Sequence, residues 1–184
     1  MGKFVVKKGS DPIKKIGLFG GTFNPIHIGH IKMAEAARKE YKLDVVYFIP
    51  CGIPPHKSKK DLLPAKKRFE LVKKAIREKK HFKVLDVEIK KKTKAYTIDT
   101  IRELSVGIGR DQSLRLYFLI GQDEFEKLHT WNKTNQLAKL VTFLVLPRLP
   151  KKIKLPKVKK LKWHLVHTKP INISSTEIRN RINY

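Results

Sequence analysis

The sequence predicts a doubly wound α/β fold, in which helices cover both faces of a parallel β-sheet. Short runs of β-branched and aromatic residues alternate with longer segments of helical period, which is the pattern of repeated βαβ units. Most of the short runs are continuously apolar, as strands covered on both faces should be. A length of 184 residues fits one domain of this class.

Six segments have the composition of strands in such a sheet. They are expected at Ile16–Phe19, Val45–Ile49, Phe82–Val87, Leu116–Ile120, Val141–Leu146 and Trp163–His167. Residues 1–14 are expected to form a tail or an added edge segment, and residues 15–184 are expected to form the single domain.

Apolar period locates two of the helices between these strands. Behind Pro64, a favoured first helical residue, the apolar residues of one helix recur at i, i+4, i+7 and i+11. These residues are Ala65, Phe69, Val72 and Ile76. A second helix is expected over Ile98–Leu104, stopped by Gly107 and Gly109.

Charge is the extreme feature of the composition. Lys and Arg number 42 against 16 Asp and Glu, which gives a net charge of +26 at pH 7. Such a surface attracts phosphates, nucleotides or nucleic acid, so both a polyanion-binding role and a lysine-rich solvated surface stay open. The densest basic stretch is 148–162. Because it contains two prolines and no apolar period, we expect an exposed excursion between the last two strands.

Other features of the composition indicate a cytoplasmic protein without a membrane anchor. No apolar run approaches the ~18–20 residues that cross a bilayer, and the first residues lack the apolar segment of a secretory signal. Cys51 is the single cysteine, so it forms no internal disulfide and has no second thiolate for a structural zinc site. We expect Cys51 to be a small residue at a strand end.

A phosphate site is predicted where the first strand enters a helix through the sequence GGTFNPIHIGH, residues 20–30. The glycines allow a ligand close to the backbone, and the helix start offers free N–H groups and a positive dipole end. His27 and His30 can both face the ligand, because Gly29 places no side chain between them. Their N–H groups can stabilise phosphoryl charge in a transition state. Two buried structural histidines or a metal pair are the alternatives, and metal is disfavoured because no obvious third ligand is near.

A second anion site is predicted near the C-terminus, where residues 173–179 read ISSTEIR. Ser174 and Glu177, three residues apart, make a capping box, so a helix begins here with hydroxyls and Arg179 beside it. A triphosphate held between two helix ends, with His on one and Arg on the other, is what attack at an α-phosphate requires when pyrophosphate leaves.

These two motifs carry a resemblance to a known superfamily. GGTFNPIHIGH resembles the HxGH signature of the nucleotidyltransferases, and ISSTEIR resembles their second signature, ISSTxIR. The G-x-G-x-x-G of dehydrogenases and the P-loop are absent. The HIGH tetrapeptide also occurs in class I aminoacyl-tRNA synthetases, but those enzymes need a much longer chain and a KMSKS-type loop.

Three further segments narrow the resemblance: PPHK at 54–57, YTIDT at 96–100, and GQD at 121–123 with Trp131 beyond it. Alone, each fits a turn, a helix cap or a core aromatic equally well. Together, in this order, they make the chain similar to the bacterial nicotinate-nucleotide adenylyltransferases from Gly17 to about Ile182. This resemblance implies a Rossmann-like fold and transfer of the adenylyl group of ATP to nicotinate mononucleotide, giving deamido-NAD and pyrophosphate. It implies Mg²⁺ bound with ATP and no resident metal.

The resemblance also implies the role of each site residue. The catalytic residues would be His27, His30, Lys57 and Arg179. The ATP-binding residues would be Gly20, Gly21, Thr22, Phe23, His27, His30, Gly121, Asp123, Ser174, Ser175, Thr176 and Arg179, with Asp123 contacting ribose or organising Mg²⁺. The substrate-binding residues would be Lys57, Tyr96, Thr97 and Trp131, with the pyridine ring stacked on the indole and Thr97 helping to hold the carboxylate.

Two other functions remain as alternatives. One is an adenylyltransferase for nicotinamide mononucleotide or phosphopantetheine, although phosphopantetheine enzymes carry T-x-G-H and His27 argues against them. The other is a basic nucleic-acid-binding module that kept the fold and lost catalysis, which the presence of His27, His30 and Arg179 makes less favoured. Asn24 stands where many members of the family carry Asp, a difference expected to be minor.

Overall fold

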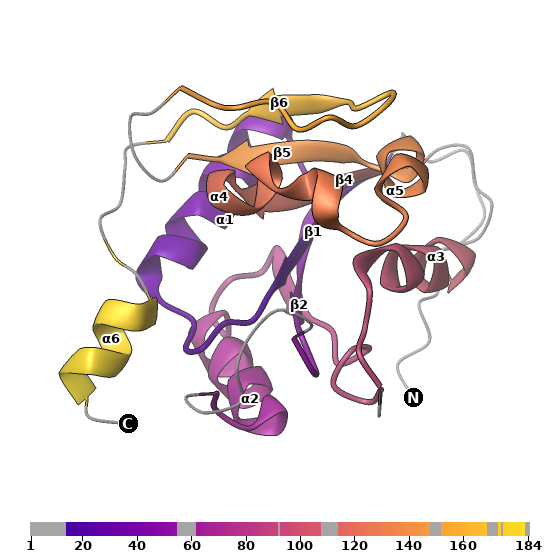
Figure 1. Cartoon of the computed structure of the whole chain (residues 1–184). Helices are drawn as coiled ribbons and strands as arrows, with labels where there is room; N and C mark the ends of the chain where they lie inside the picture. The colour runs from indigo at the N-terminus through magenta and orange to yellow at the C-terminus, as the bar shows by residue number, and fades with distance from the viewer. Residues whose placement is uncertain are drawn as a thin grey trace.

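The sheet has six parallel strands, and its order reverses beside the first strand (Figure 1). The computed structural model describes residues 14–54, 62–91, 93–107, 114–147, 152–168, 173 and 175–182. The sheet order is β3-β2-β1-β4-β5-β6. The strands are β1 (Lys14–Gly21), β2 (Val45–Pro50), β3 (Phe82–Val84), β4 (Leu114–Gly121), β5 (Thr142–Leu146) and β6 (Trp163–Leu165). This is the doubly wound fold that the sequence predicts.

Helices occupy most of the connections between the strands, and one follows the last strand. They are α1 (Ile28–Tyr41), α2 (Ala65–Ala75), α3 (Thr97–Gly107), α4 (Gln122–Glu126), α5 (Thr134–Leu140) and α6 (Ser175–Ile182), with a 3₁₀ turn at Leu128–Thr130. None of the helices in the described part of the chain is both long enough and apolar enough to span a membrane.

Alternate strand residues face two separate apolar layers, as parallel strands buried on both sides require. Leu18 of β1 packs in the layer that includes side chains of α3, α4 and α5. Its neighbour Phe19 packs in the opposite layer, with side chains of α1 and α2. Both are at most 5% exposed, and burial of a side chain of this size contributes about 1.5–3 kcal/mol. The two layers therefore hold the strand ends in fixed positions.

Helix α2 differs in detail from its expected apolar stripe. Pro64 lies just before the helix, not at its first position. Val72 and Ile76 are buried as expected, but Phe69 is only half-buried. The largest fully buried side chain on this helix is that of Arg68. A charged group tolerates this position because backbone carbonyls satisfy its guanidinium, and a hydrophobic pattern cannot reveal such partners.

Two strands, β3 and β6, end earlier than expected. β3 ends at Val84, and a turn begins at Val87, which carries Glu88 away from the sheet. β6 ends at Leu165, although the N–H of Val166 still donates to the Val145 carbonyl at 2.9 Å. Apolar composition alone does not predict where β3 and β6 end, because buried residues continue beyond the last residue that pairs with the neighbouring strand.

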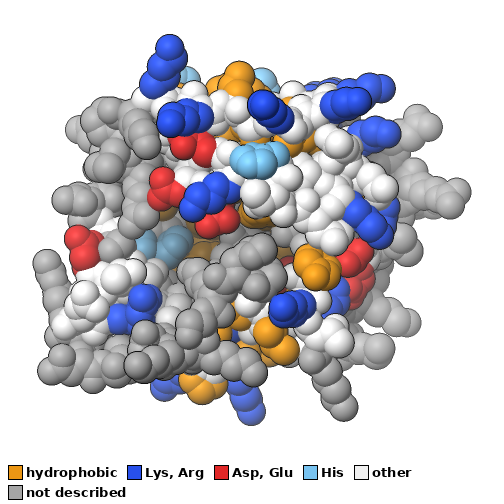
Figure 2. Space-filling model, viewed as in Figure 1, with side chains coloured by type: hydrophobic (Ala, Val, Ile, Leu, Met, Phe, Trp, Pro, Cys, Tyr) orange, Lys and Arg blue, Asp and Glu red, His pale blue; other side chains and the backbone are white. Residues whose placement is uncertain are grey.

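The basic excursion before β6 is exposed on its charged side and anchored on the other, which refines the expectation. The side chains of Ile153, Val158 and Leu161 pack against the core, whereas the lysines from 152 to 162 are exposed. The N–H of Lys159 donates to Asn135 Oδ1 at 3.0 Å, which ties the segment to α5. Figure 2 shows Lys and Arg side chains spread over much of the visible face, not gathered in one patch.

Candidate active site

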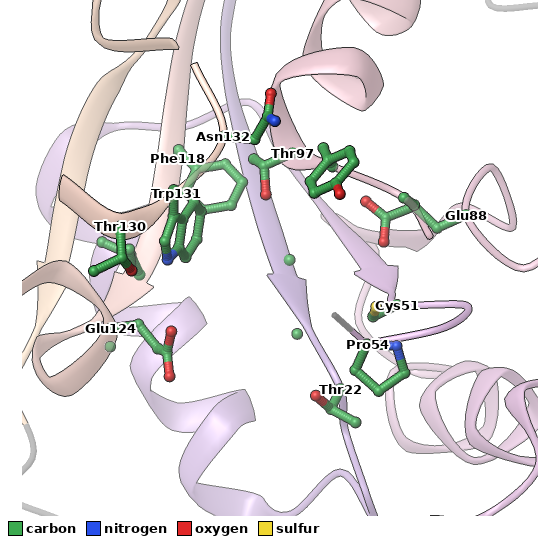
Figure 3. A pocket seen from close by; sticks show the side chains of 16 residues that line it. Thr22, Cys51, Pro54, Glu88, Thr97, Phe118, Glu124, Thr130, Trp131 and Asn132 are labelled. Atoms are coloured by element: carbon green, nitrogen blue, oxygen red, sulfur yellow. The ribbon is translucent and has the colours of Figure 1, made fainter. Parts of the chain in front are cut away.

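A cavity of about 400 Å³ opens at the carboxyl ends of β1 and β4, where the strand order reverses (Figure 3). Open α/β sheets bind their ligands at this position, because the connections on either side diverge there. Seven of the residues proposed from the sequence line this one cavity. They are Gly20, Gly21, Thr22, Tyr96, Thr97, Gly121 and Trp131.

Aromatic side chains form much of the cavity wall. The Trp131 ring meets Phe118 edge-on, with centroids 6.0 Å apart and planes at 88°. Tyr96 is 39% exposed just before α3, so its ring is accessible to a ligand. A Cβ on Gly20 would lie 3.1 Å from the Phe118 ring, so this glycine makes room for the aromatic wall as well as for a ligand. The cavity suits a flat heteroaromatic ring.

Two carboxyl groups also line the cavity, and the sequence reasoning singled out neither. Figure 3 shows Glu124, Thr130 and Trp131 on one side and Glu88 on the other, near Cys51. No Lys or Arg side chain lines the cavity within the described ranges. The positive charge of the chain therefore does not extend to the described cavity wall.

The histidine pair lies at the start of α1, directly after the loop that begins at Thr22. His27 is the N-cap residue and His30 the third helical residue, and their ring centroids are 3.7 Å apart. The backbone N–H of His27 donates to His30 Nδ1 at 3.2 Å. Because this nitrogen accepts a hydrogen bond, the proton of the neutral ring belongs on Nε2, which is then the donor nitrogen of the ring. The pair does not line the 400 Å³ cavity but lies beside its β1 edge.

Phe23 is a core residue through its ring. It has a φ of 46° and is only 3% exposed. A Cβ on Gly21 would approach the Phe23 ring to 3.0 Å, so a larger residue there would press on this ring. The ring also meets His30 at 5.2 Å and nearly perpendicular. The Phe23 side chain thus supports the His30 imidazole.

The C-terminal motif is docked onto the loop of the first motif. Arg179 Nη1 donates to the Asn24 carbonyl at 2.7 Å, and Nη2 donates to Thr176 Oγ1 at 3.3 Å. Ser175 Oγ donates to the Pro25 carbonyl at 3.0 Å. Figure 1 shows α6 beside the first turn of α1. The structure thereby brings the two expected anion sites together.

The expected minor effect of Asn24 in place of Asp stays a prediction, and one contact of the Asn24 side chain bears on it. Its side chain is 6% exposed, and Oδ1 accepts a hydrogen bond from the Leu63 N–H at 2.9 Å. An aspartate could accept the same bond, because this contact needs only an oxygen acceptor.

Arg68 holds the backbone beneath the site, and the sequence analysis did not find it. Its guanidinium donates to the carbonyls of Thr22 at 2.7 Å, Gly52 at 2.8 Å and Leu63 at 3.0 Å. Burial lowers the pKa of Arg68, while the nearby Cys51 acts in the opposite direction. Three charge-assisted hydrogen bonds therefore join the loops after β1 and β2 to the start of α2. An arginine that follows two lysines and lies off the apolar stripe gives no sequence signal for such a role.

Three other residues proposed for the site do not line the cavity or lie outside the described part of the chain. Asp123 is exposed in the first turn of α4 and does not line the cavity, although its neighbours Gly121 and Glu124 do. Lys57 and Ser174 lie outside the described residues. Within the described ranges, no group of three or more His, Cys, Asp or Glu side chains is arranged to hold a metal ion.

Comparison with known proteins gives one consistent result. The cytidylyltransferase-like family model matches residues 18–181. A protein of Shouchella clausii described as a probable nicotinate-nucleotide adenylyltransferase is 42% identical over 171 residues, covering 92% of this chain and 85% of its own. One of Exiguobacterium sibiricum, with the same description, is 40% identical over 168 residues, covering 91% and 86%.

The fold also matches solved structures. Nicotinic acid mononucleotide adenylyltransferase of Plasmodium falciparum, complexed with NaAD, superposes with a TM-score of 0.73 at 20% identity. The match covers 91% of this chain and 83% of that one. At this identity the likeness concerns the fold alone, and it agrees with the sheet order described above.

Proposed function

Because this chain belongs to the cytidylyltransferase-like family and, within it, to the nicotinate-nucleotide adenylyltransferases, we propose that it adenylylates nicotinate mononucleotide. ATP supplies the adenylyl group, and the products are deamido-NAD and pyrophosphate. The observation that best supports this activity is the meeting of three features at one edge of the sheet. They are the histidine pair of α1, the docked Arg179 of α6, and the aromatic cavity between β1 and β4.

The reaction is one in-line displacement at phosphorus. An oxygen of the 5′-phosphate of nicotinate mononucleotide attacks the α-phosphorus of ATP and forms the new P–O bond. The bond from the α-phosphorus to the bridging oxygen breaks, and pyrophosphate leaves with its electron pair. A phosphate is already anionic at neutral pH, so the protein supplies position and charge stabilisation in place of a general base.

The histidine pair stabilises the reacting phosphates in this proposal. With Nδ1 of His30 accepting from the backbone, its Nε2–H is a fixed donor, and the ring is supported by Phe23. A donor whose orientation is set before the reaction stabilises developing charge at little reorganisation cost. Lys57 is proposed to add a mobile point charge to the same phosphates.

Arg179 is proposed to bind the outer phosphates of ATP with Ser174, Ser175 and Thr176. Two of its N–H groups hold Asn24 and Thr176, and a guanidinium has five N–H donors in all. Its position beside the first-motif loop places its charge near the histidine pair. Four residues that line the cavity are proposed to contact the nucleotide along the sheet edge: Gly20, Gly21, Thr22 and Gly121.

The 400 Å³ cavity is proposed to bind the pyridine ring. Trp131 provides a face for stacking, and Tyr96 and Thr97 lie across from it just before and at the start of α3. Thr97 is proposed to help hold the carboxylate of the ring. Cavities of roughly this size bury small ligands with a few polar groups that fix the orientation.

Mg²⁺ fits this site as an ion that enters with ATP. It keeps several waters and binds through one or two carboxylates together with substrate phosphates. Asp123 and Glu124, in the first turn of α4, are the carboxylates proposed to bind this ion. When bound, the ion would neutralise phosphate charge.

A pyrophosphate-release assay tests the proposal. ATP is offered with nicotinate mononucleotide, nicotinamide mononucleotide or phosphopantetheine in parallel reactions, and the adenylylated product is identified by mass. We expect the fastest release with nicotinate mononucleotide, accompanied by deamido-NAD. Release with phosphopantetheine alone, or with none of the three, would contradict the proposal.

A further inference from the structure

Glu88 occupies a distinctive place in the cavity wall. It lies in the turn after β3 and is 8% exposed, and its carboxyl end points into the cavity (Figure 3). It faces the side that carries Trp131. A buried carboxyl directed at a ligand cavity has a specific electrostatic effect on whatever binds there.

The position of this carboxyl is fixed from two directions. Thr100 Oγ1 donates to Glu88 Oε1 at 2.9 Å, and the Thr100 N–H donates to the Tyr96 carbonyl at 3.2 Å. The backbone of Glu88 packs so closely on Gly52 that a Cβ there would lie 2.2 Å from the Glu88 carbonyl oxygen. The carboxyl is therefore held against the first turn of α3, which begins with Thr97.

The surroundings of Glu88 make its neutral form more accessible than that of an exposed glutamate. Burial raises its pKa, and Glu103 acts in the same direction. Hydrogen bonds from Thr100 and Cys51 and the charge of Lys91 act against this shift, but the net pKa is raised. Lys91 is itself paired with Glu103, at 2.9 Å. Across the cavity lies another carboxyl group, that of Glu124.

We propose that Glu88 is a specificity-determining residue, because its buried carboxyl is held by Thr100 in the wall of the cavity proposed for the pyridine ring; this inference rests on the proposed function. When this carboxyl is protonated, it donates a hydrogen bond to the carboxylate of nicotinate mononucleotide. A hydrogen bond to an ionised acceptor is roughly twice as strong as one between neutral groups, so the neutral acid favours nicotinate over nicotinamide. Once ionised, Glu88 repels the nicotinate carboxylate and can accept from the nicotinamide N–H. Preference for nicotinate therefore falls as pH rises.

The test measures kcat/KM for both mononucleotides from about pH 5.5 to about pH 8.5 and uses their ratio. The 5′-phosphate titrates alike in both substrates, so its effect cancels. For the wild type we expect the ratio to fall at least ~10-fold with rising pH. Glu88→Gln, neutral at every pH, should keep the ratio nearly constant and within ~3-fold of the wild-type value at low pH.

Two further variants complete the test. Glu88→Ala should lower the ratio at least ~10-fold at low pH, because the donor is gone. Glu124→Gln is the matched control, and the pH dependence of its ratio should persist. Binding of both mononucleotides without ATP, followed by tryptophan fluorescence, should show the same ratios.

Particular results would overturn the inference. One is a wild-type ratio that favours nicotinate equally at all pH values, and another is a pH dependence that survives in Glu88→Gln or disappears in Glu124→Gln. Both leave adenylyl transfer to nicotinate mononucleotide intact. Absence of turnover with either pyridine mononucleotide would instead reject the proposed function.

Discussion

Arg179 and Asn24, far apart in the sequence, are joined by a 2.7 Å hydrogen bond from the guanidinium to the backbone carbonyl. This bond connects the helix of the second motif to the loop that precedes the histidine pair. Arg179 is also proposed to bind ATP. Through its contact with Asn24, ATP binding can therefore affect the order of the loop that precedes the histidine pair.

Replacing Arg179 by Ala should lower kcat/KM for ATP at least ~100-fold, because both a charge on the triphosphate and the contact with Asn24 are lost. Steady-state kinetics at varied ATP measure this effect. The matched control is Asn180→Ala, an exposed neighbour on α6. If both variants lose activity equally, the effect comes from disturbance of the helix.

His30→Ala should lower turnover at least ~100-fold and leave ATP affinity within a few-fold, because a donor used mainly in the transition state affects rate more than binding. Two further substitutions, His30→Gln and His30→Asn, refine this prediction. The amide of Gln can reach the place of Nε2–H, whereas that of Asn matches Nδ1, which accepts from the His27 N–H. We expect His30→Gln to retain more turnover than His30→Asn. The reverse order would show that Nε2 is not the catalytic donor.

Arg68→Met should destabilise the protein by about 3 kcal/mol, because it leaves the carbonyls of Thr22, Gly52 and Leu63 without their donor. Urea unfolding of this variant and of the control Lys67→Met, an exposed neighbour on α2, provides the comparison. Equal stability of the two variants would mean that other groups satisfy these carbonyls.

The lysines of the basic excursion should affect substrate capture more than turnover. Exchanging several of Lys151, Lys152, Lys154, Lys157, Lys159, Lys160 and Lys162 for Gln should leave kcat nearly unchanged, because screening over about 8 Å at physiological salt limits their reach. Lower kcat/KM at low salt, fading as salt is added, is the expected effect. A large loss of turnover at saturation in a folded variant would place the excursion in the active site.

Local patterns were sufficient to predict the sheet and the two motifs. Continuous apolar runs such as Val45–Ile49 are typical of buried parallel strands. The sequence GGTFNPIHIGH contains a turn, a helix start and two histidine hydrogen-bond donors within eleven consecutive positions. Trp131, Tyr96 and Thr97 were found through the order of short motifs, and the structure places all three on one cavity.

Residues that act through long-range contacts were not predictable in this way. Arg68 satisfies carbonyls from three separate segments, and it follows two exposed lysines in the sequence. Glu88 enters the cavity because β3 ends early and Thr100 of α3 holds its carboxyl. Neither contact leaves a local pattern, since each depends on how distant segments pack.

The relative kcat/KM of the wild-type protein for nicotinate and nicotinamide mononucleotide, measured with saturating ATP at one fixed pH near neutrality, tests the central claim most directly. A site that holds a carboxylate through charge-assisted hydrogen bonds should prefer nicotinate by about 2 kcal/mol, or at least ~30-fold. Comparable values for the two mononucleotides, or a preference for nicotinamide, would contradict the assignment of nicotinate mononucleotide as the substrate.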